Sequence, residues 1–118
     1  MTRSKWLPAI LLAALAPLAA QAHTHLQGAT PAEGSTVKAP ESIMLMFSEA
    51  AKVTALTIQK DGDKEQKLSP LPTEAAAHVM VPAPTLAPGK YTVNYRVVSD
   101  DGHVMSGKIH FTVSDTAK

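Results

Sequence analysis

Two short stretches of the chain offer side chains that could share a metal ion. Asp101 and His103 stand two residues apart, so in an extended segment their side chains lie on one face of the chain. The other stretch begins at His23, directly after the small residues of a secretory cleavage site. If the chain is cut there, the free α-amine and imidazole Nδ1 of His23 can close a chelate ring on one ion. Nitrogen-rich tetragonal coordination favours Cu(II), which also binds most tightly among the divalent first-row metals.

Each stretch also has an ordinary structural interpretation. Asp101-Gly102 is a common hairpin-turn dipeptide, and a histidine at a chain end is usually solvated. His25 offers a competing copper site, because a free amine with histidine at the third position chelates Cu(II) through two deprotonated backbone amides. We favour the folded site, since strands hold its side chains and so lower the cost of ordering them. His78 and His110 are expected to be surface histidines.

The first 22 residues are typical of a secretory signal peptide. A basic start, with Arg3 and Lys5, precedes the apolar stretch Leu7 to Ala20 and a small-x-small cleavage sequence that ends at Ala22. An uncleaved membrane anchor is the alternative, but a span needs about 20 apolar residues. This stretch is shorter and is interrupted by two prolines. We therefore expect cleavage and an exported, periplasmic domain of residues 23–118.

Composition limits the remaining function classes. Removing residues 1–22 from the 118 leaves 96, and the loss of Arg3 and Lys5 changes the formal charge from +1 to −1. Such balanced charge gives no basic footprint for nucleic acid. The absence of cysteine excludes disulfides, thiol catalysis and iron–sulfur clusters. An aromatic content of 4% is low for stacking on bases or sugars.

Closely spaced prolines and the lack of helical periodicity indicate an all-β domain. The clearest strand is Tyr91 to Val98, in which apolar and polar residues alternate. Ser42 to Phe47 is apolar on both faces, which predicts a central strand covered on both sides. Further strand signals cover residues 53–60, 64–68, 77–81 and 108–113. About seven short strands in under 100 residues predict an antiparallel sandwich of immunoglobulin-like size.

Four segments of the chain form a recognisable series. They are His23-Thr24-His25-Leu26 with Ala29-Thr30-Pro31-Ala32, then Leu45-Met46-Phe47-Ser48-Glu49, then Pro88 to Tyr95, and finally Ser99 to Gly107. The last segment fits the pattern Ser-x-Asp-x-His-x-x-x-Gly. In order and spacing, over essentially the whole mature chain, these segments resemble the periplasmic copper-resistance protein CopC family.

The resemblance implies an antiparallel Greek-key sandwich or barrel that binds one Cu(II) ion in the periplasm. It implies as copper ligands the α-amine and imidazole of His23 together with Asp101 and His103. Some members add a carboxylate, which falls on Glu49 here. A CopD-like inner-membrane copper transporter, or another periplasmic copper protein, is the partner that the resemblance suggests.

Methionines set this chain apart from some members of that family. Those members hold Cu(I) in a methionine-rich loop, because soft thioethers select Cu(I). The corresponding loop here, Asp61 to Thr73, has no methionine, which predicts a protein that binds only Cu(II). The methionines are scattered along the chain, and we expect them to fill gaps in the core. They are Met44, Met46, Met80 and Met105.

Three functions from different classes remain. The first is a protein that buffers or hands over Cu(II), with no small-molecule substrate and no catalysis. The second is a copper-dependent oxidative enzyme with a histidine-brace site. It is disfavoured because an aspartate ligand fills the copper plane, whereas catalytic metals keep an open position. The third is a structural sandwich domain without a metal site, since fold alone does not specify function.

Overall fold

The computed structural model describes residues 24–117. The predicted signal peptide and His23 therefore lie outside the described residues. No helix in the described part of the chain is long and apolar enough to cross a membrane. Residues 24–117 form seven strands: β1 (Leu26–Thr30), β2 (Ser35–Val37), β3 (Ser42–Lys60), β4 (Gln66–Lys67), β5 (Ala76–Pro82), β6 (Gly89–Ser99) and β7 (Val104–Val113).

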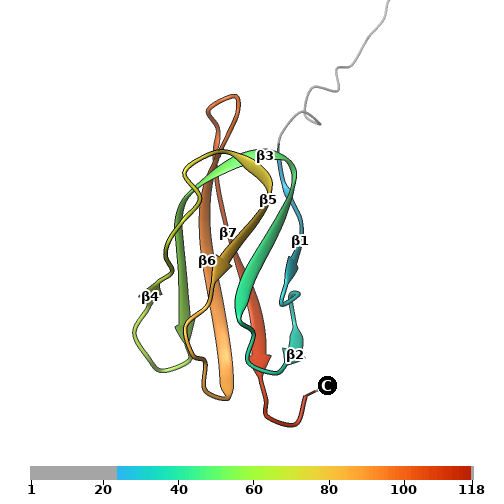
Figure 1. Cartoon of the computed structure of the whole chain (residues 1–118), viewed down its shortest axis with the longest axis vertical. Helices are drawn as coiled ribbons and strands as arrows, with labels where there is room; N and C mark the ends of the chain where they lie inside the picture. The colour runs from blue at the N-terminus through green and yellow to red at the C-terminus, as the bar shows by residue number, and fades with distance from the viewer. Residues whose placement is uncertain (1–23, 118) are drawn as a thin grey trace, which may run out of the picture.

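The long strand β3 belongs to both layers of the fold (Figure 1). Its first half, residues 42–47, lies between β1 and β5, and both pairings are antiparallel. Its second half, residues 51–60, pairs with β6 and with the short β4. β6 also pairs with β7, and β2 pairs with the other edge of β7. The strand order is therefore β1-β3-β6-β7-β2. The all-β prediction is confirmed, and β2 beside β7 is the parallel exception to the expected antiparallel pairing.

Two predicted strands prove to be one. Residues 42–47 and 53–60 were expected to be separate, whereas β3 runs through both without a break. Register shifts at residues 46–51 and 53–55 let the strand bend between the layers, as β-bulges do. The predicted strand 64–68 shrinks to the two residues of β4, while β5, β6 and β7 contain the other three predictions.

The core is filled by the inward-facing residues of both layers. Tyr91, Val93 and Val97 are buried as the alternation predicted. Tyr91 stacks on Phe111 at 5.6 Å between ring centroids, and its hydroxyl donates a 2.6 Å hydrogen bond to the carbonyl of Ala87. This bond ties the Leu86–Gly89 turn to β6, in the manner of a tyrosine corner.

The expectation that the methionines fill the core is wrong for three of the four. Met105 packs against the core, but Met80 is 59% exposed, and Met44 and Met46 are half-buried. The residues between them, Ile43 and Leu45, are almost fully buried. The first half of β3 is therefore central in its sheet but has only one face in the core. The sequence correctly indicated that this segment is apolar on both faces. The prediction that both faces are covered is wrong.

Candidate metal centre

The turn between β6 and β7 holds Asp101 and His103 in a closed hairpin. The last residue of β6, Ser99, donates from its amide to the carbonyl of His103 at 2.9 Å and accepts from the amide of Gly102 at 2.9 Å. Gly102 has φ of 87°, a conformation that glycine adopts without the strain of a side chain. The Asp-Gly dipeptide thus forms the hairpin turn that its sequence indicated, and this turn positions the two candidate ligands.

Within the turn, the side chains of Asp101 and His103 contact each other. Asp101 Oδ2 lies 2.8 Å from His103 Nδ1, and the His103 amide donates to Asp101 Oδ1 at 3.3 Å. Both side chains are exposed, by 50% for Asp101 and 60% for His103. The structure therefore brings together two of the four predicted ligand residues in a pair that faces solvent.

Ser99 holds Asp101 in place by a hydrogen bond, a role that was not assigned to it from the sequence. It is a buried polar residue, and its hydroxyl donates a short hydrogen bond to Asp101 Oδ1. This bond, followed by the contact with His103, lowers the pKa of Asp101 from 3.8 to about 2. Asp101 thus stays ionised at any pH at which a histidine could bind metal. The first residue of the Ser-x-Asp-x-His pattern was the available signal for this role.

The beginning of the described chain is fixed to β3 close to this turn. The carbonyl of His25 accepts from the amide of Ser48 at 2.8 Å, and the His25 amide donates to the Ser48 hydroxyl at 3.0 Å. Thr24 is buried. Ala51, three residues after Ser48, pairs with Ser99. The point at which the described chain begins and the tip of the β6–β7 hairpin accordingly lie at the same end of the molecule (Figure 1).

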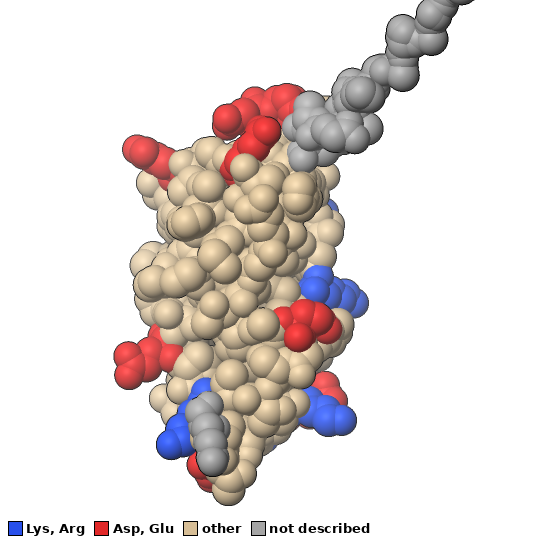
Figure 2. Space-filling model, turned by 90° about the vertical axis from the view of Figure 1, so that its right-hand side faces the viewer, with Lys and Arg blue, Asp and Glu red and all other residues tan. Residues whose placement is uncertain are grey.

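Glu49 lies at this end as well. It is exposed on β3, next to Ser48 and two residues before Ala51. Figure 2 shows acidic side chains gathered at the end of the molecule where the described chain begins. Within residues 24–117, however, no three His, Asp or Glu side chains form a group that could hold a metal ion. Glu49 is therefore near the Asp101–His103 pair without forming a ligand cluster with it in this structure.

The other histidines are exposed, as expected. His78 lies on β5, and His110 on β7 pairs with Glu33, whose Oε2 is 3.1 Å from His110 Nδ1. His25 is exposed too, but its backbone is engaged. The competing chelate through deprotonated amides would require the His25 amide to leave Ser48 and lose its proton. The hydrogen bonds at Ser48 thus oppose that mode of copper binding.

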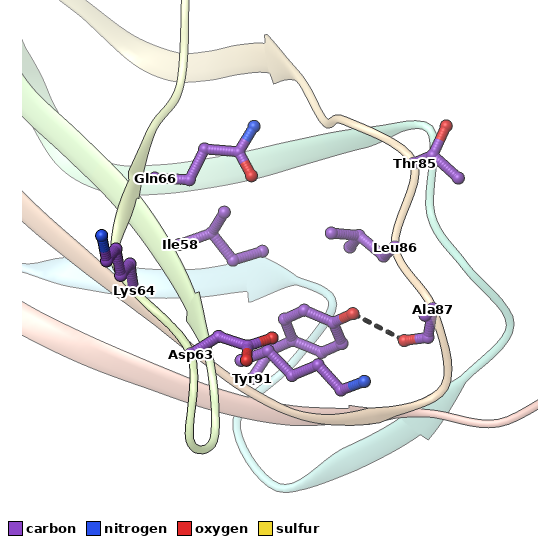
Figure 3. A pocket seen from close by; sticks show the side chains of 9 residues that line it. Ile58, Asp63, Lys64, Gln66, Thr85, Leu86, Ala87 and Tyr91 are labelled. Carbon is purple, nitrogen blue, oxygen red and sulfur yellow. Dashed lines mark hydrogen bonds between the residues drawn. The ribbon is translucent and has the colours of Figure 1, made fainter.

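One surface pocket lies away from the Asp101–His103 pair. It has a volume of about 230 Å³ and lies between the β3–β4 connection and the turn before β6 (Figure 3). Tyr91 and Ala87, joined by their hydrogen bond, form one wall. Tyr91 and Ser99 are near opposite ends of β6, which at about 3.3 Å per residue are roughly 26 Å apart. The candidate metal site is thus an exposed turn at one end of the sandwich.

The chain is similar to known proteins over most of its length. The family described as the CopC domain matches residues 26–114. Protein YobA of Escherichia coli K12 is 36% identical over 111 residues, covering 89% of this chain and 90% of YobA. Copper resistance protein C of Pseudomonas syringae pv. tomato is 36% identical over 104 residues, covering 80% of this chain and 82% of that protein.

Solved structures give the same result. The crystal structure of CopC from Methylosinus trichosporium OB3b aligns with a TM-score of 0.69 and 29% identity, over 81% of this chain and 98% of that one. PcoC from Escherichia coli, a methionine-rich copper resistance protein, aligns with a TM-score of 0.58 and 30% identity, over 79% of this chain and 100% of PcoC. From its sequence pattern, its seven-stranded fold and these relatives, the chain belongs to the CopC family.

Proposed function

We propose that this protein is exported to the periplasm, cleaved after Ala22, and binds one Cu(II) ion for copper resistance or homeostasis. The copper resistance proteins among its relatives support copper as the ion. The observation that carries the proposal is the ordered Asp101–His103 pair, which lies at the end of the domain where the chain is fixed to β3. His23 supplies the remaining nitrogens in this proposal.

The proposed ligands are the α-amine and imidazole of His23, the imidazole of His103 and the carboxylate of Asp101. Glu49 is a candidate for a further oxygen ligand, because it is exposed at the same end. In the structure Asp101 contacts Nδ1 of His103, so binding of copper through Nε2 would preserve that contact. A carboxylate on the second ring nitrogen fixes the orientation of a ligating histidine and raises its basicity. Direct ligation by Asp101 requires its carboxylate to turn partly from the ring toward the ion.

The proposed activity is the holding and transfer of copper, with no substrate bond broken. The Asp101–His103 pair is exposed at an end of the domain, so a partner can approach and exchange ligands there one at a time. A CopD-like inner-membrane transporter or another periplasmic copper protein is the proposed partner. The acidic side chains near this end favour the approach of a cation.

The proposal is tested by comparing two purified forms of the protein with electron paramagnetic resonance during Cu(II) titration. One form begins at His23 and the other carries a single additional glycine before it. We expect the extension to abolish tight binding, because it removes the α-amine of His23 from the chelate ring. His103→Ala should also weaken binding strongly.

A matched control separates the folded site from the local chelate. His25→Ala in the form that begins at His23 should leave tight binding unchanged, since His25 is not a proposed ligand. Equal affinity and one spectrum for both N-terminal forms would rule out the terminal amine as a ligand. Loss of binding in His25→Ala alone would assign the copper to the local chelate instead.

A further inference from the structure

A second set of metal-binding side chains lies on the outer surface of the sheet formed by β1, the first half of β3, and β5. Met44 on β3 is directly opposite Met80 on β5, and Met46 is directly opposite His78. Opposite residues of an antiparallel pair have Cβ atoms about 4.5–5.5 Å apart, and diagonal neighbours about 7–8 Å. These four residues, here called the methionine face, thus bring three thioethers and one imidazole within reach of a single point.

All four side chains point away from the core. The positions between them are 0–2% exposed: Ile43, Leu45, Phe47, Val79 and Val81. Because side chains alternate along a strand, the methionine face must lie on the opposite side of the sheet. Met80 is 59% exposed, His78 is exposed, and Met44 and Met46 are half-buried. The thioethers can therefore be reached from solvent.

The neighbouring strand leaves room at this surface. Gly28 on β1 pairs with Met46, and a Cβ atom at Gly28 would come within 3.1 Å of the Met46 methyl carbon. Met46 therefore lies over the glycine, and its three rotatable bonds allow it to turn toward β5. A larger residue at position 28 would crowd this side of the methionine face.

The surroundings of the methionine face match a soft ion of low charge. Residues 26–30, 42–48 and 76–82, which form these three strand segments, contain no Lys, Arg, Asp or Glu. Hard ions such as Mg²⁺ and Ca²⁺ need oxygen ligands that the four residues do not supply. Thioethers select Cu(I), and imidazole also suits copper. The chain has four methionines after Met1, and three of them are on this surface.

We propose that the methionine face is a Cu(I) site formed by Met44, Met46, Met80 and His78. It is separate from the Asp101–His103 pair and from the methionine-free loop of residues 61–73. The prediction of a protein that binds only Cu(II) rested on that loop, and this site would revise it. The inference goes beyond the proposed function and does not depend on His23 being a ligand.

A protein-docking surface is the alternative use of these side chains, because exposed methionines adapt to different partners. The metal site is favoured by the direct pairing of Met46 with His78, which adds a copper-binding nitrogen to the thioethers. The four residues also occupy neighbouring positions of two paired strands, which fixes the spacing of their Cβ atoms before any ion binds.

The test uses the whole protein beginning at His23, labelled with ¹³C at the methionine methyl groups, under anaerobic conditions. Cu(I) is added in competition with a chromophoric Cu(I) chelator, and Ag(I) serves as a probe that does not change oxidation state. We expect the methyl signals of Met44, Met46 and Met80 to shift on binding. The methyl signal of Met105, which packs against the core, is the internal control and should stay in place.

Substitutions then identify the ligands. Met→Leu changes conserve volume and so disturb packing little, and we expect each of them on the methionine face to weaken Cu(I) binding about tenfold or more as a thioether ligand is lost. Met105→Leu is the matched control and should change affinity less than twofold. His78→Asn should weaken binding as well, whereas His103→Ala should leave Cu(I) binding intact while it weakens Cu(II) binding.

Several outcomes would overturn the proposal. It fails if the protein does not compete for Cu(I), or if the triple Met→Leu variant binds Cu(I) as tightly as the parent. Should that variant lose its fold, the methyl shifts of the parent protein decide the question alone. Shifts in those methyl signals only on addition of a periplasmic protein, with none for Cu(I) or Ag(I), would assign the surface to docking.

Discussion

The hydroxyl of Ser99 is predicted to organise the Asp101–His103 pair, and Ser99→Ala tests this role. The substitution removes the donor to Asp101 Oδ1 and a 3.3 Å contact with the carbonyl of His103. Ser99 is only 7% exposed, and alanine is smaller, so the variant has no steric conflict. Any change in the properties of Asp101 in this variant should therefore result from the loss of the hydrogen bond.

The size of the effect follows from the causes of the Asp101 pKa. Because the Ser99 hydrogen bond is the largest of them, we expect the pKa of Asp101 to rise from about 2 toward the ordinary 3.8. It should remain below 3.8, since His103 also lowers it. A carboxyl group with a lowered pKa stabilises the folded state above its unfolded pKa, and this contribution disappears as the pH falls through the folded pKa. The parent should thus lose it progressively as the pH falls from about 4 to about 2, and the variant should have a smaller contribution to lose, over a narrower range just below pH 4.

The assay is an NMR titration of the Asp101 carboxyl carbon in the metal-free protein, followed by a Cu(II) competition titration at pH 7. We expect Cu(II) affinity to fall about tenfold, because partners that orient a metal ligand typically contribute 10–100-fold to affinity. Ser35→Ala is the matched control, since it removes a 2.7 Å hydrogen bond from a hydroxyl to the carbonyl of Ala32 in another turn. An unchanged Asp101 pKa in Ser99→Ala, or equal losses of affinity in both variants, would refute this account of the turn.

Three further predictions follow from the site and the fold. Cu(II) affinity should fall steadily from pH 8 to pH 5 in a competition titration, because the α-amine and the histidine imidazoles must lose their protons to bind the metal. A flat profile would exclude them as ligands. Gly107→Ala should lower the free energy of unfolding, measured by urea denaturation, by about 1–3 kcal/mol. The reason is that a Cβ atom there would overlap the ring and hydroxyl of Tyr95. An unchanged free energy of unfolding would mean that Tyr95 moves without cost. Tyr91→Phe should cost about 1 kcal/mol by loss of one hydrogen bond, with copper affinity unchanged because Tyr91 lies toward the other end of β6.

The sequence predicted the strands whose apolar residues alternate. In β6 the inward residues Tyr91, Val93 and Val97 are buried as the period of two required. β1 and β2 were missed for physical reasons. β1 contains Gly28 and lacks a clear alternation, and β2 is a three-residue strand held by parallel pairing with the distant β7.

The candidate site was predictable in its residue types and only partly in its geometry. The pair Asp101 and His103 was found because the spacing of two and the family pattern agree, and the structure joins the two side chains. The role of Ser99 depends on its burial, which its residue type does not reveal. The methionine face was missed because a strand that is apolar on both faces is ordinarily covered on both. In this fold the core covers only the face that carries Ile43 and Leu45.

The bend in β3 has a consequence for how the domain unfolds. One continuous strand supplies hydrogen-bonding partners to β1, β4, β5 and β6. Neither layer can therefore separate from the other without breaking the strand that both use. Unfolding should be a single cooperative transition, with amide exchange slowest in the paired and buried parts of β3 on either side of the bend and fastest in β2 and β4.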